Sequence, residues 1–460
     1  MSTLRSILGL HRIPFVRHAA TFQIGSIVMT ATGLISSVLY ARLLGIEQFG
    51  LFAVVSSFTG VICIIASFGQ ETTLVTFLSE AVGRKNKTDI ETVLRYFIQS
   101  TLLAIGFYAI LFFLAPTLAT YLDSGATVGG LARLLILNTA LQSPPVLVFL
   151  MLQIRGQVAL VTILENIRAL LQVGISIVLL LLGHGVEGIV LSMLIVSVLY
   201  LPVCAILYRR HARILGFPHM KMLLQTCHQG GTAPYFRQGL WIAFDRQISR
   251  NLYPNLFLLV LEKTSSLSVV GLFRLALRLG SLPADMITPN ITRLSAVTIP
   301  KLAAQNTERL KETCLKLMKG MLGIISLAIL GVALIVPPLV PVVYGAEFSQ
   351  SILPLLIILP FNFISAFSVA TVPVARLFKK VWMLTVSNAL GIIVGLSGFF
   401  LLRGLIGPLN AMSASILLYH INSIVLALIL WRFILTQHAK IKTDRLARET
   451  AILEHNDVTV

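Results

Sequence analysis

Residues 96–122, which read YFIQSTLLAIGFYAILFFLAPTLATYL, decide the class of fold because they contain no Asp, Glu, Lys or Arg. The hydrocarbon core of a bilayer is about 30 Å thick, and about 20 helical residues are enough to cross it. The whole chain of 460 residues is 56% hydrophobic and only 12% charged. Soluble globular proteins are about 25% charged. The sequence therefore predicts an all-α integral membrane protein and excludes a soluble enzyme.

Other charge-free stretches extend the same pattern along the chain. They predict further membrane spans over 18–41, 48–70, 134–154, 169–186, 188–208, 320–346, 348–375, 381–402 and 404–431. Between 237 and 301, charges interrupt long apolar runs, but that region has the length for two more helices, near 237–261 and 267–299. The sequence therefore predicts twelve transmembrane helices.

Basic residues predict the orientation of these spans, because cytoplasmic loops of membrane proteins carry an excess of Lys and Arg. With both ends of the chain inside, 27 of the 36 basic residues fall on one side. The opposite side holds only Arg42, Arg133, Lys263 and Arg403. The pattern predicts a multi-pass protein with cytoplasmic N- and C-termini. It also accounts for the net charge of +18 without a nucleic-acid partner.

The chain resembles itself at a shift of 221 residues. Gly50-Leu-Phe52 recurs as Gly271-Leu-Phe273, and Glu91-Thr92 recurs as Glu312-Thr313. In the same register Pro116 falls on Pro337. Because each copy holds an even number of spans, both copies have the same orientation. We therefore predict two six-helix lobes related by a pseudo-two-fold axis.

The repeat and the basic segments together predict the organisation of the chain. The predicted parts are a basic interfacial segment (1–17), an N-lobe with spans one to six (18–208), a cytoplasmic linker (209–236), a C-lobe with spans seven to twelve (237–434) and a cytoplasmic basic tail (435–460). Transporters built from repeats typically bind their substrate at the repeat interface and alternate access between its two sides. Alternating access is thus the expected mechanism.

Spans seven and eight carry charges that a lipid-facing helix does not tolerate. Four arginines at helical spacing are expected near the midplane of the bilayer, namely Arg246, Arg250, Arg274 and Arg278. Each would cost about 2.5–3.5 kcal/mol against lipid, so they are expected to face a wet or anion-filled interior. Guanidinium groups match phosphate and carboxylate oxygens bidentately. The sequence therefore predicts a substrate-binding site for an anion, such as a phosphate or diphosphate.

Acidic residues in or near the spans leave an alternative open. Asp245 or Asp285 could pair internally with these arginines, and Glu71 and Glu165 are further candidates for ion coupling or charge pairing. Glu165 with Arg168 would form a self-satisfied pair near the cytoplasmic end of span five. The chain has no phosphate-binding loop and no His/Cys spacing typical of a metal site. We therefore expect no catalytic residue, no cofactor and no metal, and hence no enzyme.

Three motifs carry a family resemblance. The stretch Tyr40-Ala-Arg-Leu-Leu-Gly-Ile-Glu-Gln-Phe-Gly-Leu-Phe52 resembles the junction of the first two spans in polysaccharide and O-antigen flippases. Those proteins form part of the multidrug/oligosaccharidyl-lipid/polysaccharide exporter superfamily. Val269-Val-Gly-Leu-Phe273 repeats the pattern, and Val343-Tyr-Gly-Ala-Glu-Phe348 resembles the family's signature before span ten. Members often carry an Asp-Arg pair close to the second motif, whereas Asp245-Arg246 lies further upstream, so no family role is transferred to Asp245.

The resemblance implies a function in surface polysaccharide biosynthesis. It implies that undecaprenyl-diphosphate-linked oligosaccharide, a lipid-linked glycan, moves from the inner to the outer leaflet of the bacterial inner membrane. The resemblance also implies that H+, Na+ or the membrane potential drives this transport step. The expected partners are membrane lipids and a functional link to the glycosyltransferases and polymerase of the same pathway. Two alternatives stay open. A cation-coupled drug exporter of the same superfamily predicts an acidic cavity, and a membrane polysaccharide polymerase or ligase predicts a large external loop.

Overall fold

The computed structural model describes most of the chain. It covers residues 14–457 except 65, 67–69, 123, 213, 215–216, 219, 226–227, 229, 238, 241–251, 289–290, 293–294, 296–298, 300–306 and 378–380. Within this part every regular element is a helix, as predicted. Longer helices are α2 (Pro14–Ile62), α3 (Gln70–Gly83), α4 (Lys87–Tyr121), α5 (Gly125–Ala140), α6 (Ser143–Ile154), α7 (Val158–Leu181), α8 (Gly185–Ala212), α11 (Tyr253–Thr264), α12 (Leu267–Gly280), α14 (Thr307–Val343), α16 (Asn362–Leu377) and α17 (Val381–Asp457). Shorter helices are α9 (Met220–Gln225), η3 (Ala346–Ser351), α15 (Ile352–Ile358) and η4 (Leu359–Phe361).

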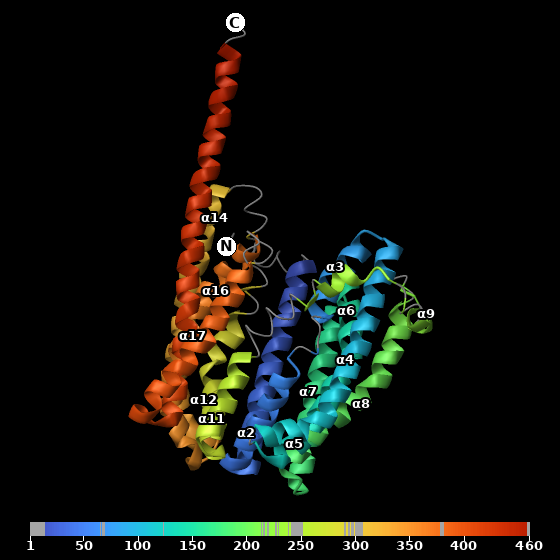
Figure 1. The fold of residues 1–460 in the computed structure, drawn as a ribbon, viewed down its shortest axis with the longest axis vertical. Coiled ribbons are helices and arrows are strands. Elements are labelled where there is room, and N and C mark those ends of the chain that lie inside the picture. The colour runs from blue at the N-terminus through green and yellow to red at the C-terminus, as the bar shows by residue number, and fades with distance from the viewer. Residues whose placement is uncertain are drawn as a thin grey trace, which may run out of the picture. The chain divides into compact units, whose positions relative to one another are not determined.

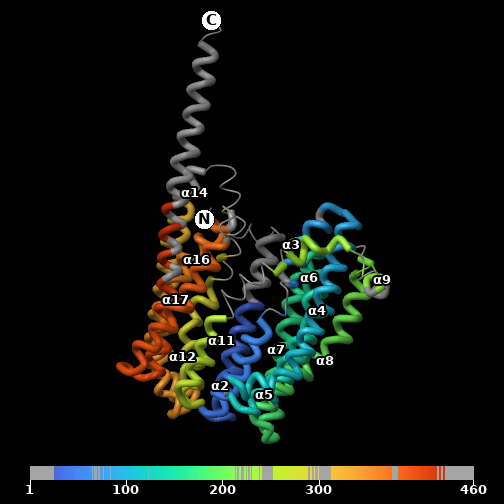
Figure 2. Tube along the Cα trace, in the orientation of Figure 1, coloured from blue at the N-terminus to red at the C-terminus, as the bar shows by residue number. Residues whose placement is uncertain are grey.

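Two compact units make up the chain. One contains Met1–Arg274 together with Val340–Ser349, and the other contains Leu275–Leu339 together with Gln350–Val460. In the first unit α4 packs on α5, and α7 packs on both α2 and α8 (Figure 1). Figure 2 follows the chain through these helices as a tube. The predicted division into lobes at the linker 209–236 stays a prediction.

Nine helices in the described residues are long and apolar enough to cross a membrane. Two of them fold back on themselves at a glycine with positive φ, Gly45 in α2 and Gly407 in α17. The ring centroids of Tyr40 and Phe52 lie only 6.1 Å apart. Twelve residues along a straight helix would separate them by about 18 Å. The nine helices therefore account for eleven of the predicted crossings, and much of the remaining one, near 237–261, lies outside the described residues.

The second fold-back has equally direct evidence in the other unit. The Tyr419 hydroxyl donates a hydrogen bond to Asn388 Oδ1 at 3.2 Å, from the opposite side of the bend at Gly407. A Cβ on Gly398 would lie 2.2 Å from Leu418 Cδ1, so the two arms also pack closely beside the bend. α17 is therefore a helical hairpin that continues into a long C-terminal helix.

Span five shows where a rule based on charge-free stretches fails. The rule begins this span at residue 169, whereas α7 runs from Val158 to Leu181. Glu165 and Arg168 lie inside the helix, so a rule that stops at every charge starts the span too late. Arg133 has the same effect in the preceding span, where its Nε donates to the Phe112 carbonyl at 3.0 Å. A charge with a protein partner does not end a membrane helix.

The repeated Gly-Leu-Phe motifs meet in space. A Cβ on Gly50 would lie 1.9 Å from the Leu267 carbonyl oxygen, and a Cβ on Gly271 would lie 2.5 Å from the Ile46 carbonyl oxygen. Each glycine thus contacts the carbonyl four residues before the other glycine. Reciprocal contact of this kind is the signature of a local two-fold axis. The register of 221 found in the sequence therefore relates α2 to α12.

Charged residues of the repeat also form equivalent ion pairs. Arg95 pairs with Glu91 at 3.9 Å in α4, and Lys316 pairs with Glu312 at 2.6 Å in α14. Both are pairs of residues four apart on one helix. The pair in α14 is exposed, whereas only 15% of the Arg95 side chain is exposed. Their agreement in register supports the duplication.

The motif 343–348 packs on the fold-back of α2, which explains why 340–349 belongs to the first unit. Arg42 Nε donates to the Val343 carbonyl at 2.7 Å, and Arg42 also donates to the Val342 carbonyl. The Ser37 and Tyr344 hydroxyls are 2.9 Å apart. Phe49 meets Phe348 edge to face, with ring centroids 6.0 Å apart. The three motifs that carry the family resemblance therefore lie together around the α2 bend.

We predict that Gly50→Ala and Gly271→Ala each lower the free energy of unfolding by about 1–3 kcal/mol, because the added Cβ overlaps backbone atoms that cannot move aside. The measurement is thermal unfolding of the purified protein in detergent. Gly106→Ala in α4 is the matched control, since a Cβ there meets nothing within 4 Å. Equal melting temperatures for all three variants would contradict the close approach.

Candidate functional site

The predicted arginines of span eight form a polar stripe on an otherwise buried helix. Of residues 270–283, all are buried except Arg274, Arg278 and Ser281. Their spacing of four and three residues places them on one helical face. Since the other faces of α12 are covered by protein, the residues that face open space are the polar ones. This is the arrangement expected of a helix that lines a wet interior.

Asp285 lies at the end of this stripe and forms an ion pair with Arg278. Arg278 Nη1 lies 3.8 Å from Asp285 Oδ2, and the Ser281 hydroxyl donates to the same oxygen at 2.8 Å. The ion pair anticipated from the sequence is thus present. It is open to solvent, because 38% of the Arg278 side chain and 50% of the Asp285 side chain are exposed. Guanidinium N–H groups therefore stay accessible to a ligand.

Several predicted residues cannot be compared with the structure. Asp245, Arg246 and Arg250 lie outside the described residues, as does the side chain of Glu71 in α3. Arg274 and Arg278 are therefore the two predicted anion-binding residues whose surroundings the structure describes.

Glu165 and Arg168 lie deeper in the membrane helix than their sequence context indicated. Arg168 falls near the middle of α7 and Glu165 about a third of the way along it, whereas the charge-free rule placed them at the cytoplasmic end of the span. Arg168 Nη2 donates to the Ser197 hydroxyl at 3.4 Å, and its guanidinium lies 6.0 Å from the centre of the Tyr200 ring. Ser197 in turn donates to Asn138 Oδ1 at 2.7 Å. A polar network from α5 and α8 thus holds Arg168 in place.

This pair also lines a cavity of about 380 Å³ in the first unit. Its polar lining comes from the region of α6, with Gln142 and Gln153, and from α7, with Glu165, Arg168 and Gln172. Sequence reasoning treated Glu165 and Arg168 as a self-satisfied pair and missed the cavity. The available signal was the spacing 165, 168 and 172, which places three polar residues on one face of a single helix.

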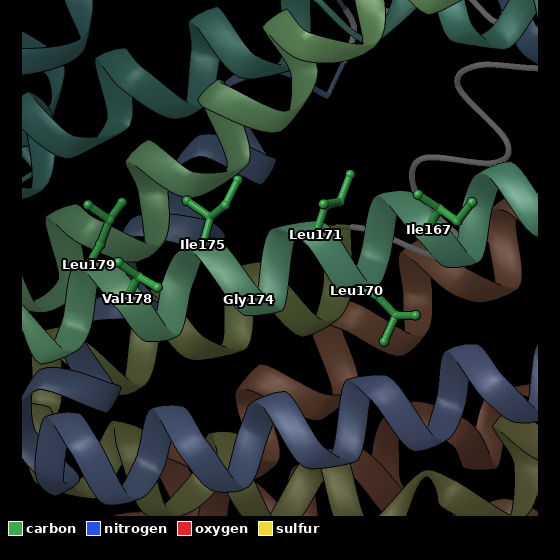
Figure 3. A pocket seen from close by; sticks show the side chains of 7 residues that line it. All are labelled: Ile167, Leu170, Leu171, Gly174, Ile175, Val178 and Leu179. Atoms are coloured by element: carbon green, nitrogen blue, oxygen red, sulfur yellow. The ribbon is translucent and has the colours of Figure 1, made fainter.

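Another face of α7 has the opposite character. Figure 3 shows seven side-chain positions along the helix that line a shallow groove of about 470 Å³, and all seven residues are apolar. Leu170, Leu171 and Val178 among them are exposed. An apolar surface of this kind suits contact with lipid tails. One face of α7 is thus polar and suits a ligand, whereas the other face is apolar and suits lipid.

The sequence and the fold each resemble those of known proteins. A family model described as polysaccharide biosynthesis protein matches residues 39–353. The lipopolysaccharide biosynthesis protein WzxC of Escherichia coli (strain K12) is 34% identical over 125 residues. That alignment covers 27% of this chain and 25% of the relative, so it spans about a quarter of either protein.

Solved structures resemble nearly the whole chain. An inward-facing multidrug resistance MATE family transporter of the MOP superfamily matches with a TM-score of 0.69 at 14% identity, over 91% of this chain and 99% of that one. A mutant of the Vibrio cholerae MATE transporter VcmN matches with a TM-score of 0.64 at 16% identity, over 92% and 97% of the two chains. At these identities the likeness shows the fold, which is that of the MATE transporters.

We predict that a cysteine at Ser281 reacts with a hydrophilic thiol reagent, whereas a cysteine at Ala276 or Leu282 does not, because only position 281 faces water. The measurement is the mass shift of the labelled protein in membranes. The background is a variant in which serine or alanine replaces the native Cys63, Cys204, Cys227 and Cys314. Labelling at 281 by lipid-soluble reagents alone would place the stripe against lipid instead.

Proposed function

This chain belongs to the polysaccharide biosynthesis protein family and has the fold of a MATE transporter, and we propose that it is an alternating-access flippase. Its substrate is an undecaprenyl-diphosphate-linked oligosaccharide, which it moves from the inner to the outer leaflet of the cytoplasmic membrane. The glycan then serves surface polysaccharide biosynthesis. The proposal agrees with the resemblance to polysaccharide flippases carried by the motifs at 40–52, 269–273 and 343–348.

The polar stripe of α12 carries this proposal. The membrane-spanning helix begins at Leu267 and ends at Thr288. At 1.5 Å per residue, Arg274 and Arg278 lie about 10 Å and 16 Å along it, close to its middle. An arginine against lipid at this depth would cost about 2.5–3.5 kcal/mol. A diphosphate that passes along the stripe supplies the oxygens that two guanidinium groups bind in bidentate fashion.

The sign of the charge favours a lipid-linked glycan over a cationic drug. The stripe holds two arginines and one aspartate, so it is basic even when Asp285 is ionised. A cationic substrate would be repelled at the point where it crosses the membrane. The anionic diphosphate is attracted there, and Asp285 acts as a charge partner that limits how tightly the phosphates are held. Transport of this kind moves its substrate without chemical change, so the protein acts as a transporter and not as an enzyme.

Alternating access requires contacts that close one side and then open. With cytoplasmic termini, the bend at Gly45 and the motif at 343–348 lie on the outer face of the inner membrane. There the hydrogen bonds from Arg42 to the Val342 and Val343 carbonyls and the contact between Ser37 and Tyr344 hold the α2 bend against 342–348. We assign these contacts to the closed state of the outer face, which opens to release the glycan.

We predict that Arg274→Ala and Arg278→Ala each reduce glycan export at least about tenfold, because losing a charge-assisted hydrogen bond costs about 1.5–3 kcal/mol. Arg246→Ala and Arg250→Ala are expected to behave alike. The measurement is surface polysaccharide in cells that lack their own flippase, alongside the amount of variant protein in the membrane. Arg→Lys variants keep the charge but lose the bidentate geometry, so their export is expected to be intermediate.

Arg403→Ala is the matched control for this series. Arg403 is an arginine outside the stripe whose guanidinium lies over the Phe400 ring at 5.1 Å, and its loss is expected to leave export unchanged. Wild-type export in all four arginine variants would reject the anion site.

We predict that linking positions 37 and 344 stops export. The variant carries Ser37→Cys and Tyr344→Cys in the background without native cysteines, and a short bifunctional thiosulfonate joins the two through disulfides that reduction breaks. Export is measured before linkage, after linkage and after reduction. Either cysteine alone is expected to export glycan after the same treatment. Full export by the linked protein would show that this contact persists throughout transport.

A further inference from the structure

The cavity beside α6 and α7 has a chemistry different from that of the α12 stripe. Its charged side chains are one acid and one base, Glu165 and Arg168, so the cavity has no net charge. Three glutamine amides accompany them, Gln142, Gln153 and Gln172. A phosphate would find no excess of positive charge here. A neutral ligand with many hydroxyl groups would find both donors and acceptors.

Two of these amides are available for a ligand. Neither Gln142 nor Gln153 is buried, and within the described part of the chain their side chains have no hydrogen-bond partner. They lie eleven residues apart on the same face of the α6 segment, about 16 Å along its axis. An amide in a membrane helix that faced lipid would lose its hydrogen bonds, at a cost of about 1–3 kcal/mol. Their position on the cavity wall avoids that cost only if water or a ligand occupies the cavity.

The remaining lining is apolar and partly aromatic. Val146 and Phe149 lie between the two amides on the α6 face. Small-ligand sites commonly combine such an apolar or aromatic surface with a few placed polar groups. The cavity volume of about 380 Å³ also falls within the range of about 300–1,000 Å³ that such sites occupy. An aromatic face with amides at its edges suits a sugar ring, which has apolar C–H faces and hydroxyls around its rim.

The polar network behind Arg168 indicates that the cavity is preformed. Ser197 bonds both Arg168 and Asn138, and the Tyr200 hydroxyl donates to the Leu164 carbonyl at 2.6 Å. Asn138 and Ser197 are buried, so the network is fixed by packing between α5, α7 and α8. A binding group held by such supporting hydrogen bonds loses little conformational freedom when its ligand arrives.

From these observations we infer that the cavity lined by Gln142, Gln153, Glu165, Arg168 and Gln172 binds neutral sugar residues of the transported substrate. The inference rests on the proposed function and extends it. The α12 stripe recognises the diphosphate, and this cavity recognises the hydroxyl groups of the glycan. Binding at two chemically distinct places makes the protein select a carrier that bears sugar over the bare carrier lipid.

The test measures binding of two probes to the purified full-length protein in lipid nanodiscs. The first probe is a panel of neutral oligosaccharides with two to five hexose or N-acetylhexosamine units and no phosphate. The second is undecaprenyl diphosphate without sugar. The variants are Gln142→Leu and Gln153→Leu in the cavity and Arg278→Ala in the stripe. Gln48→Leu, at an exposed glutamine of α2 outside the cavity, is the matched control.

We expect each cavity variant to weaken oligosaccharide binding about tenfold, which corresponds to the loss of one or two hydrogen bonds. Binding of undecaprenyl diphosphate should stay unchanged in the cavity variants, which also shows that they fold. Arg278→Ala should show the opposite pattern, and Gln48→Leu should bind both probes like the wild-type protein.

Each contrary outcome identifies which claim fails. If no oligosaccharide binds, or if Gln142→Leu and Gln153→Leu bind it like the wild-type protein, the sugar site is wrong and the proposed flippase function stands. If the cavity variants lose undecaprenyl diphosphate instead, the cavity belongs to the carrier and the inference is overturned. If the carrier does not bind the wild-type protein while oligosaccharides do, the diphosphate site of the proposed function fails and the sugar site stands.

Discussion

The contact between α2 and α12 at Gly50 and Gly271 is the constraint on which the rest depends. The two helices lie so close at these glycines that a Cβ on either one would overlap a backbone carbonyl of the other helix. This approach covers α12 near Gly271, and Ile358 and Asn362 cover its other end at Gly280 and Ala284. Of residues 270–283, Arg274, Arg278 and Ser281 are the ones that are not buried. A side chain at either glycine would separate α2 and α12 at this contact.

A second principle acts across the whole molecule, namely that polar groups in a membrane must have partners or face water. Arg133 and Arg42 donate hydrogen bonds to backbone carbonyls. Arg168 donates a hydrogen bond to Ser197 and lies over the Tyr200 ring. The polar residues of the α12 stripe and of the cavity beside α7 face open space instead. The first is basic and the second is neutral and rich in amides, so the two surfaces suit the two polar parts of a lipid-linked glycan.

Much of the fold could be predicted because hydrophobic length is a strong signal. The helical class, the spans and the register of the repeat followed from charge-free runs and from matched glycine, proline and charged positions. The bounds of span five were wrong, since Glu165 and Arg168 were taken as the end of a helix that continues past them. Whether a charge ends a span depends on its partners, and the partners of Arg168, namely Ser197 and Tyr200, are about 30 residues away in the sequence.

The sequence by itself determined that the chain is an all-α membrane protein, that it is duplicated, and that arginines lie at the middle of span eight. These properties depend on composition and on spacing along one helix, which are local. The tertiary structure alone decided that the repeated glycines touch, that the arginine stripe is the open side of a buried helix, and that polar residues of α6 and α7 line one cavity. Such features depend on which helix faces are covered by distant segments, and no local pattern records that packing.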